Sequence, residues 1–161
     1  MRNLLGLRAI PQIEYHRPTG LREAFKLLSE LKEGYRIIAG GTDLVPSARR
    51  SKMLPSGYTH IVDISSIKEL AYIIKDGDII CIGSATRLSE IVESAVVKEY
   101  VPILAEAVSQ MGSLQIRNRG TIGGNLCNAS PAADTAPPLL VLDAMVKLRD
   151  VDKQRSVPLA E

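Results

Sequence analysis

Residues 37–44 have the sequence IIAGGTDL, in which a short apolar strand leads into a glycine pair and then into the start of a helix. Paired glycines allow positive φ and a close approach to a ligand, because neither residue carries a Cβ atom. The backbone N–H groups of such a turn, next to a helix N-terminus, attract phosphate. Two other phosphate motifs are absent, since the stretch has neither G-x-G-x-x-G nor a P-loop lysine. It therefore predicts a strand-turn-helix unit, for which an ordinary tight turn is the alternative.

Periodic apolar residues predict the elements on either side of this turn. Apolar side chains at three- and four-residue intervals predict a helix over residues 21–31, with Thr19 as its N-cap and Gly34 after its end. A buried strand over residues 35–39 leads into the glycine pair, and a shorter helix over residues 44–50 follows it. These elements belong to the first of two lobes.

The rest of the chain mixes strands and helices without the regular βαβ alternation of a doubly wound fold. Along the chain the patterns predict a linker at 51–59, a strand at 60–64, a hairpin at 71–83, helices that begin at Thr86 and Pro102, a glycine- and asparagine-rich loop at 117–131, a helix opened by Asp134 and Pro137, and a strand at 145–149. We expect an α+β fold in two lobes, residues 1–55 and residues 56–161.

The second glycine-rich segment, residues 116–134, has the sequence IRNRGTIGGNLCNASPAAD. The Thr121 and Ser130 hydroxyls can donate to phosphate, and Asn125 can both donate and accept. Asp134, an acceptor when ionised, suits sugar hydroxyls better than phosphate. A long surface loop with Asx turns is the alternative. Together the two glycine-rich segments predict a cleft between the lobes, with a pyrophosphate held between two backbone nests.

These segments resemble the FAD-binding medium subunits of molybdenum hydroxylases, a family that includes xanthine dehydrogenase, carbon monoxide dehydrogenase and 4-hydroxybenzoyl-CoA reductase types. The sequence AGGTDL at residues 39–44 resembles the first loop of the family. TIGGN at residues 121–125 and SPAAD at residues 130–134 resemble its second loop. The resemblance covers nearly the whole chain. It implies the two-lobed FAD domain of vanillyl-alcohol-oxidase-like and cell-wall-reductase-like (PCMH-type) flavoproteins, with the cofactor cleft between the lobes.

The resemblance also implies the cofactor and the residues that hold it. FAD would carry the redox chemistry, so no catalytic side chain is expected. Residues of both loops would line the pyrophosphate, and Asp134 would bind the ribityl hydroxyls. The candidate cofactor-binding residues are Ile38, Ala39, Gly40, Gly41, Thr42, Asp43, Leu44, Thr121, Gly123, Gly124, Asn125, Ser130 and Asp134.

Partner subunits follow from the same resemblance. A large subunit would hold the molybdenum cofactor and a small subunit the [2Fe–2S] clusters, from which FAD passes electrons to an external acceptor. The 2 cysteines of this chain are too few for a cluster of its own. Family members continue into a C-terminal lobe, so we expect a truncated or split subunit, and a separate chain with the third lobe is one candidate partner. The alternatives are a nucleotide-binding or assembly module without redox activity, and a stand-alone oxidase or reductase.

Composition excludes several other classes. The chain has 161 residues and a net charge of +2, without the basic face that nucleic-acid binding requires. No apolar run approaches the roughly 20 residues of a membrane span. Residues 1–10 lack the apolar core of a signal peptide, and we expect a cytoplasmic location. His16 and His60 have no partners at metal-ligand spacing, so no metal site is predicted.

Overall fold

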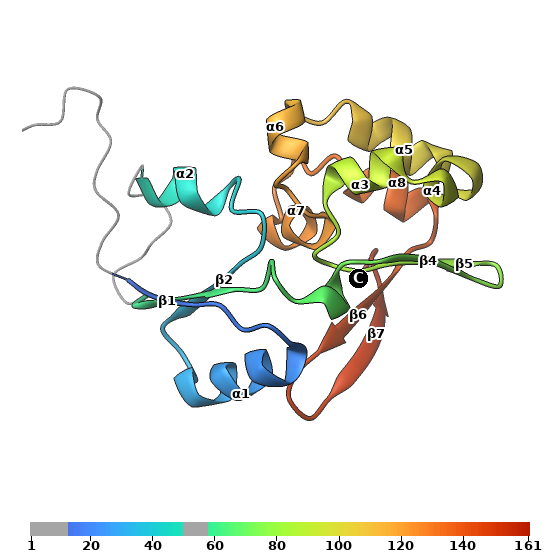
Figure 1. Cartoon of the computed structure of the whole chain (residues 1–161). Helices are drawn as coiled ribbons and strands as arrows, with labels where there is room; N and C mark the ends of the chain where they lie inside the picture. The colour runs from blue at the N-terminus through green and yellow to red at the C-terminus, as the bar shows by residue number, and fades with distance from the viewer. Residues whose placement is uncertain (1–12, 50–57) are drawn as a thin grey trace, which may run out of the picture.

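The computed structural model describes residues 13–49 and 58–161 of the chain (Figure 1). Helices and strands are mixed in both halves, which confirms the predicted α+β fold class. Most of the predicted linker at 51–59 lies outside the described residues. Among the residues that the structure describes, every helix is too short or too polar to span a bilayer.

A three-stranded parallel sheet organises the N-terminal part. Its strands are β1 (Glu14–His16), β2 (Tyr35–Ile38) and β3 (His60–Asp63), with β3 in the centre. Helix α1 (Leu21–Leu31) connects the two outer strands, β1 and β2, which run in the same direction and therefore require a crossover. Helix α2 (Leu44–Arg49) follows β2 and lies on the other side of the sheet from α1 (Figure 1).

The central position of β3 bears on the lobe boundary. This strand lies after the predicted boundary at residue 55, yet it pairs with β1 on one side and β2 on the other. It therefore belongs to the sheet of the first lobe, and the short strand predicted at residues 60–64 is not an element of the second. The division at residue 55 otherwise stays a prediction.

Helix α1 has the predicted bounds but a different N-cap residue. Gly20 occupies the N-cap position, without a side-chain cap. Thr19 instead donates through its N–H and its hydroxyl to Glu23 Oε2, at 2.8 Å and 3.0 Å. The Thr19 hydroxyl is a donor here and does not accept from the helix, so the N-cap prediction for Thr19 is wrong.

The C-terminal part packs helices over two antiparallel hairpins (Figure 1). Its elements are the 3₁₀ turn η1 (Lys68–Leu70), β4 (Ile73–Asp76), β5 (Ile79–Ile82), α3 (Leu88–Glu93), α4 (Ala95–Tyr100), α5 (Pro102–Ser109), α6 (Leu114–Arg117), α7 (Ile122–Asn128), α8 (Ala136–Val141), β6 (Met145–Arg149) and β7 (Gln154–Pro158). One apolar core joins α3, α4, α5 and α7, and its fully buried members include Ile91, Val97 and Val108.

Two predictions for this part need correction. The helix predicted from Thr86 begins after Arg87, because the buried Thr86 hydroxyl is bonded to the N–H and the carbonyl of Tyr72. The loop predicted at residues 117–131 contains the whole of helix α7, which the Thr121 hydroxyl caps by accepting from the Gly124 N–H. Strand β7 is an addition that the sequence pattern does not predict.

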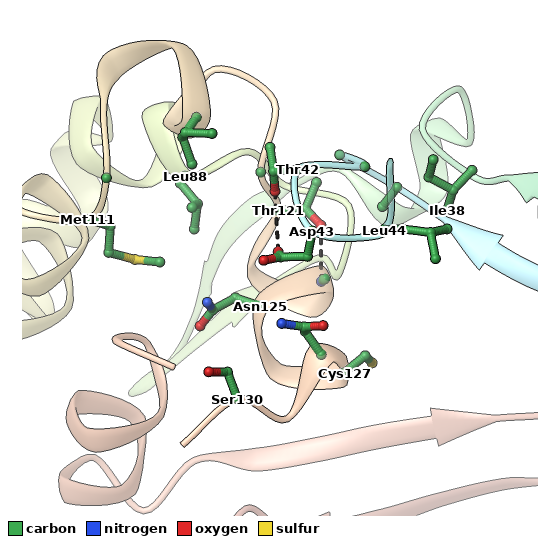
Figure 2. A pocket seen from close by; sticks show the side chains of 18 of the residues that line it. Ile38, Thr42, Asp43, Leu44, Leu88, Met111, Thr121, Asn125, Cys127 and Ser130 are labelled. Atoms are coloured by element: carbon green, nitrogen blue, oxygen red, sulfur yellow. Dashed lines mark hydrogen bonds between the residues drawn. The ribbon is translucent and has the colours of Figure 1, made fainter. Parts of the chain in front are cut away.

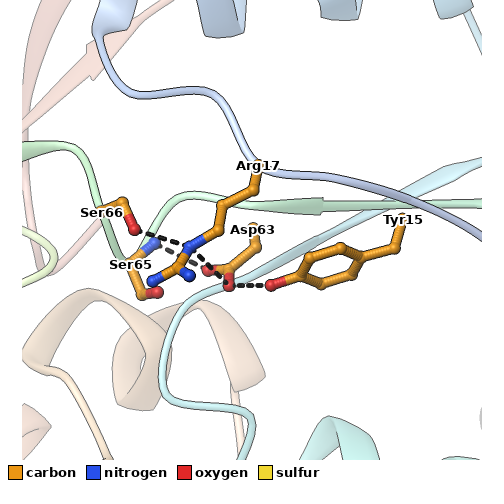
Figure 3. A network of polar contacts seen from close by, with 5 residues as sticks. All are labelled: Tyr15, Arg17, Asp63, Ser65 and Ser66. Atoms are coloured by element: carbon orange, nitrogen blue, oxygen red, sulfur yellow. Dashed lines mark hydrogen bonds and ion pairs between the residues drawn. The ribbon is translucent and has the colours of Figure 1, made fainter.

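A buried carboxylate ties β1 to the end of β3 (Figure 3). Asp63 accepts hydrogen bonds from the Tyr15 hydroxyl and from the Ser65 N–H, the latter at 2.8 Å, with Arg17 Nε at 3.9 Å. Burial alone would raise the pKa of the Asp63 carboxyl. The hydrogen bonds from Tyr15 and Ser65 and the Arg17 charge outweigh burial, and hold this pKa below its usual value.

We expect Asp63→Asn to destabilise the fold at neutral pH by about 1–3 kcal/mol, measured by urea unfolding. One oxygen becomes an NH₂ group, which cannot accept from Tyr15 or Ser65. A carboxylate with a lowered pKa stabilises the folded state above its unfolded pKa of about 3.9, and loses this contribution as pH falls through the folded pKa. The difference between the two proteins should therefore shrink below about pH 4. Asp78→Asn, at the exposed turn between β4 and β5, is the control. A difference that does not change with pH would contradict this role for the Asp63 charge.

Candidate functional site

The first glycine-rich turn presents unused backbone donors. It connects β2 to α2, and Gly41 has a φ of 73°, which a residue with a side chain adopts only under strain. The carbonyls of Gly41 and Asp43 accept from the first turns of α2. Within the described residues, the backbone N–H groups of residues 40–43 donate to no acceptor. Four successive amides without an acceptor in the described part of the chain are available to an anion, as the amides of a backbone nest are.

Gly40 brings this turn against the segment that precedes α7. A Cβ atom added to Gly40 would lie 2.1 Å from the Arg119 carbonyl oxygen and 2.8 Å from the Gly120 Cα. Both contacts are with backbone, which cannot rotate away. The two glycine-rich segments therefore touch directly, and Gly40 is required for their packing.

The second glycine pair has a different role from the one expected. The N–H of Gly123 donates to the Ser84 carbonyl at 2.9 Å, and the N–H of Gly124 donates to Thr121 Oγ1 at 3.1 Å. A Cβ atom on Gly123 would lie 2.6 Å from the Ser84 oxygen. These amides already have partners within the fold, so the expectation of a second backbone nest is wrong. The pair allows α7 to pack closely.

A pocket of about 380 Å³ lies between the first turn and α7 (Figure 2). All of the predicted cofactor-binding residues line it except Gly123, which packs on Ser84 instead. Side chains of the first turn, such as Thr42 and Asp43, lie beside Thr121 at the start of α7. The structure therefore brings together two segments that are far apart in the sequence. The volume of the pocket between them is in the range of small-molecule sites.

Other lining residues were not predicted. They are Arg36, Ile37, Leu88, Met111, Gly112, Ile116, Gly120, Cys127, Asn128 and Ala132. Leu88 and Met111 are part of the helix core, and one edge of that core forms the apolar wall of the pocket. In the sequence, the helical spacing of Leu88 and Met111 indicates that they are buried and does not indicate a ligand contact. Cys127 is exposed, and its position within the second glycine-rich segment is the one feature of the sequence that indicates a place at the pocket.

Charges around the pocket are few and of mixed sign. Among the residues that the structure describes, the charged lining residues are one cation, Arg36, and two carboxylates, Asp43 and Asp134. The Arg36 guanidinium stacks over the Tyr58 ring at 4.3 Å, and its buried Nε has no hydrogen-bond partner among the described residues. Because the carboxylates outnumber the cation, neutral donors must supply most of the attraction for an anionic ligand. The free amides of residues 40–43 are such donors.

Asn125 is held in a fixed orientation at the pocket wall. Its Oδ1 accepts from the backbone N–H of the buried Thr135 at 3.3 Å and from the Thr135 hydroxyl at 2.5 Å. With the oxygen engaged in this way, the Asn125 NH₂ group remains as a donor at the pocket. The α7 wall thus offers side-chain donors, while the first turn offers backbone donors.

Comparisons with known proteins place the chain in a family. Residues 11–161 match a family model described as the FAD binding domain in molybdopterin dehydrogenase. The chain is 34% identical over 148 residues to the carbon monoxide dehydrogenase medium chain of Hydrogenophaga pseudoflava, covering 92% of this chain and 50% of that protein. It is 36% identical over 147 residues to the xanthine dehydrogenase FAD-binding subunit of Escherichia coli O157:H7, covering 90% and 49%.

The same similarity appears among solved structures. Carbon monoxide dehydrogenase from Hydrogenophaga pseudoflava superposes with a TM-score of 0.88 at 32% identity, covering 95% of this chain and 52% of that chain. Quinoline 2-oxidoreductase from Pseudomonas putida 86 superposes with a TM-score of 0.87 at 28% identity, covering 94% and 52%. The chain therefore spans about half the length of the proteins that it matches.

Proposed function

Because the chain belongs to the family of FAD-binding domains in molybdopterin dehydrogenases, we propose that it binds FAD in the pocket between residues 39–43 and α7. The family match confirms the resemblance seen in the two glycine-rich segments. The observation that carries the proposal is the row of free amides at residues 40–43, on the wall that faces Thr121 and Asn125.

The residues of the pocket fit a flavin dinucleotide in their chemistry. The amides of residues 40–43 would bind the pyrophosphate, with the Asn125 NH₂ group on the other side. Asp134 would accept from ribityl hydroxyls, where its charge does not oppose phosphate. Leu88 and Met111 offer apolar surface to a ring. When bound, FAD supplies the electron-transfer chemistry, and this chain positions it.

We propose further that the chain serves in an oxidoreductase of the molybdenum hydroxylase type, with FAD passing electrons to an external acceptor. The molybdenum cofactor would be on a large subunit and the [2Fe–2S] clusters on a small one. The designation of relatives as medium chain or FAD-binding subunit supports this division. The two free thiols, Cys81 and Cys127, fit a reducing, cytoplasmic location.

Titration of the purified chain with FAD tests the binding proposal. We expect saturable quenching of flavin fluorescence with one FAD per chain, and competition by ADP, which shares the pyrophosphate. Failure to saturate at about 1 mM FAD, equivalent to binding weaker than about −4 kcal/mol, would contradict it. FAD binding without flavin reduction by the partner subunits would favour the assembly-module alternative.

A further inference from the structure

Both histidines of the chain lie together with a carboxylate on one face of the parallel sheet. Glu14 of β1 lies directly opposite His60 of β3, and His16 is two residues further along β1. Residues two apart in a strand point to the same face, so the pairing places all three side chains side by side. The spacing of His16 and His60 in the sequence indicates no metal site, because the cluster forms only when β1 pairs with β3.

The ligand atoms are at distances that suit one small metal ion. His16 Nε2 lies 3.1 Å from His60 Nδ1, and the two Glu14 oxygens lie 3.7 Å and 3.6 Å from these nitrogens. For a tetrahedral ion with metal–ligand distances of roughly 2.0–2.1 Å, two ligand atoms lie about 3.3 Å apart. The separation of the two nitrogens is within about 0.2 Å of that value. With one ligand atom from each residue, the three atoms lie within 4.8 Å of one another, so a rotation of the exposed Glu14 side chain has to bring one oxygen to both imidazoles.

We propose that Glu14, His16 and His60 form a binding site for a divalent transition-metal ion, with Zn²⁺ as the preferred probe. Two imidazoles and one carboxylate are a known zinc ligand set. Calcium and magnesium prefer oxygen ligands, which makes them poor occupants of this cluster. Three protein ligands leave coordination positions for water.

The surroundings of the cluster suit an accessible site. The side chains of His16 and His60 are 19% and 23% exposed, so the sheet holds the imidazoles in place. The Glu14 side chain is 67% exposed and faces the solvent, from which an ion would come. Bound metal would link the edge strand β1 to the central strand β3, and it should therefore stabilise the folded chain.

This site is independent of the proposed FAD function. None of its three residues lines the pocket. Along β1 and β3 the three residues alternate with Tyr15 and Asp63, whose network lies on the opposite face of the sheet. Loss of metal binding therefore leaves FAD binding intact, and the two proposals can fail separately.

Titration of the metal-free chain with Co²⁺ and then Zn²⁺ tests the proposal. We expect one Co²⁺ per chain, visible absorption bands from the bound ion, and their loss on addition of Zn²⁺. Because the chain has 2 histidines, both imidazoles should shift together in NMR spectra with one equivalent of Zn²⁺. Zn²⁺ should also raise the melting temperature.

Matched variants locate the site. Glu14→Gln, His16→Gln and His60→Gln should each weaken Co²⁺ binding by at least about tenfold, and leave FAD affinity unchanged. Glu106→Gln, an exposed carboxylate on α5, should bind Co²⁺ like the unmodified chain. Unchanged Co²⁺ affinity in Glu14→Gln and His60→Gln, or imidazole signals that do not move, would overturn the site and leave an ordinary hydrogen-bonded trio.

Discussion

Gly40→Ala should destabilise the fold by roughly 3 kcal/mol and weaken FAD binding by at least about tenfold. The new methyl group would lie 2.1 Å from the Arg119 carbonyl oxygen and 2.7 Å from its carbon. These are backbone atoms, which cannot rotate away. The first turn or the segment before α7 therefore has to move by roughly 1 Å or more to restore a normal contact of about 3.5 Å between the methyl group and the carbonyl. That movement would also spread the two walls of the pocket.

Urea unfolding and FAD titration of the same preparation measure the two effects. Gly20→Ala is the matched control, since a Cβ atom there meets only the Glu69 side chain at 3.4 Å. It should cost less than about 1 kcal/mol, as expected for an N-cap substitution, and leave FAD affinity unchanged. If Gly40→Ala behaves like Gly20→Ala, the two glycine-rich segments are not in contact in solution.

Local patterns predict the elements whose stability is local. The apolar spacing over residues 21–31 predicts α1 to the residue, because this helix buries one face and its periodicity records that face. Pro102 marks the start of α5, since proline fits the first helical turn. The high glycine content of residues 120–124 hides α7, because glycine disfavours helix interiors while the Thr121 cap and the Ser84 contact stabilise this one.

In the candidate site, too, the features that local sequence determines are predicted, and those that depend on distant contacts are not. The glycine pair at residues 40–41 predicts a binding turn, and no described residue accepts from its amides. The second pair, Gly123 and Gly124, looks identical in the sequence, yet its amides are bonded to Ser84 and Thr121. Whether the amides of a glycine pair are bonded within the fold depends on contacts such as the one between Gly123 and Ser84, which are far apart in the sequence. A local sequence pattern does not contain that information. The cluster of Glu14, His16 and His60 depends in the same way on the pairing of β1 with β3.

Asn125→Asp should weaken both FAD and ADP binding by about 100-fold at low salt. Aspartate has the same shape and can still accept from the Thr135 N–H and hydroxyl, so the fold should be retained. The NH₂ donor is replaced by a negatively charged oxygen next to the proposed pyrophosphate site. Two like charges about 5 Å apart repel by roughly 3 kcal/mol at an effective dielectric constant of 20, which is about a hundredfold in affinity. Isothermal titration with each ligand measures the loss.

Asp134→Asn removes a negative charge at the same pocket and should distinguish FAD from ADP. This carboxylate is proposed to accept from ribityl hydroxyls, which FAD has and ADP lacks. Its removal should therefore weaken FAD binding by about tenfold, the value of one hydrogen bond to a charged group, and leave ADP binding unchanged. If Asp134 instead lay beside the phosphates, Asp134→Asn would strengthen the binding of both ligands, because a repulsive charge would be lost. For the Asn125→Asp prediction, the contradicting outcome is an ADP affinity equal to that of the unmodified chain. That result would place the pyrophosphate away from α7 and contradict the proposed orientation of FAD.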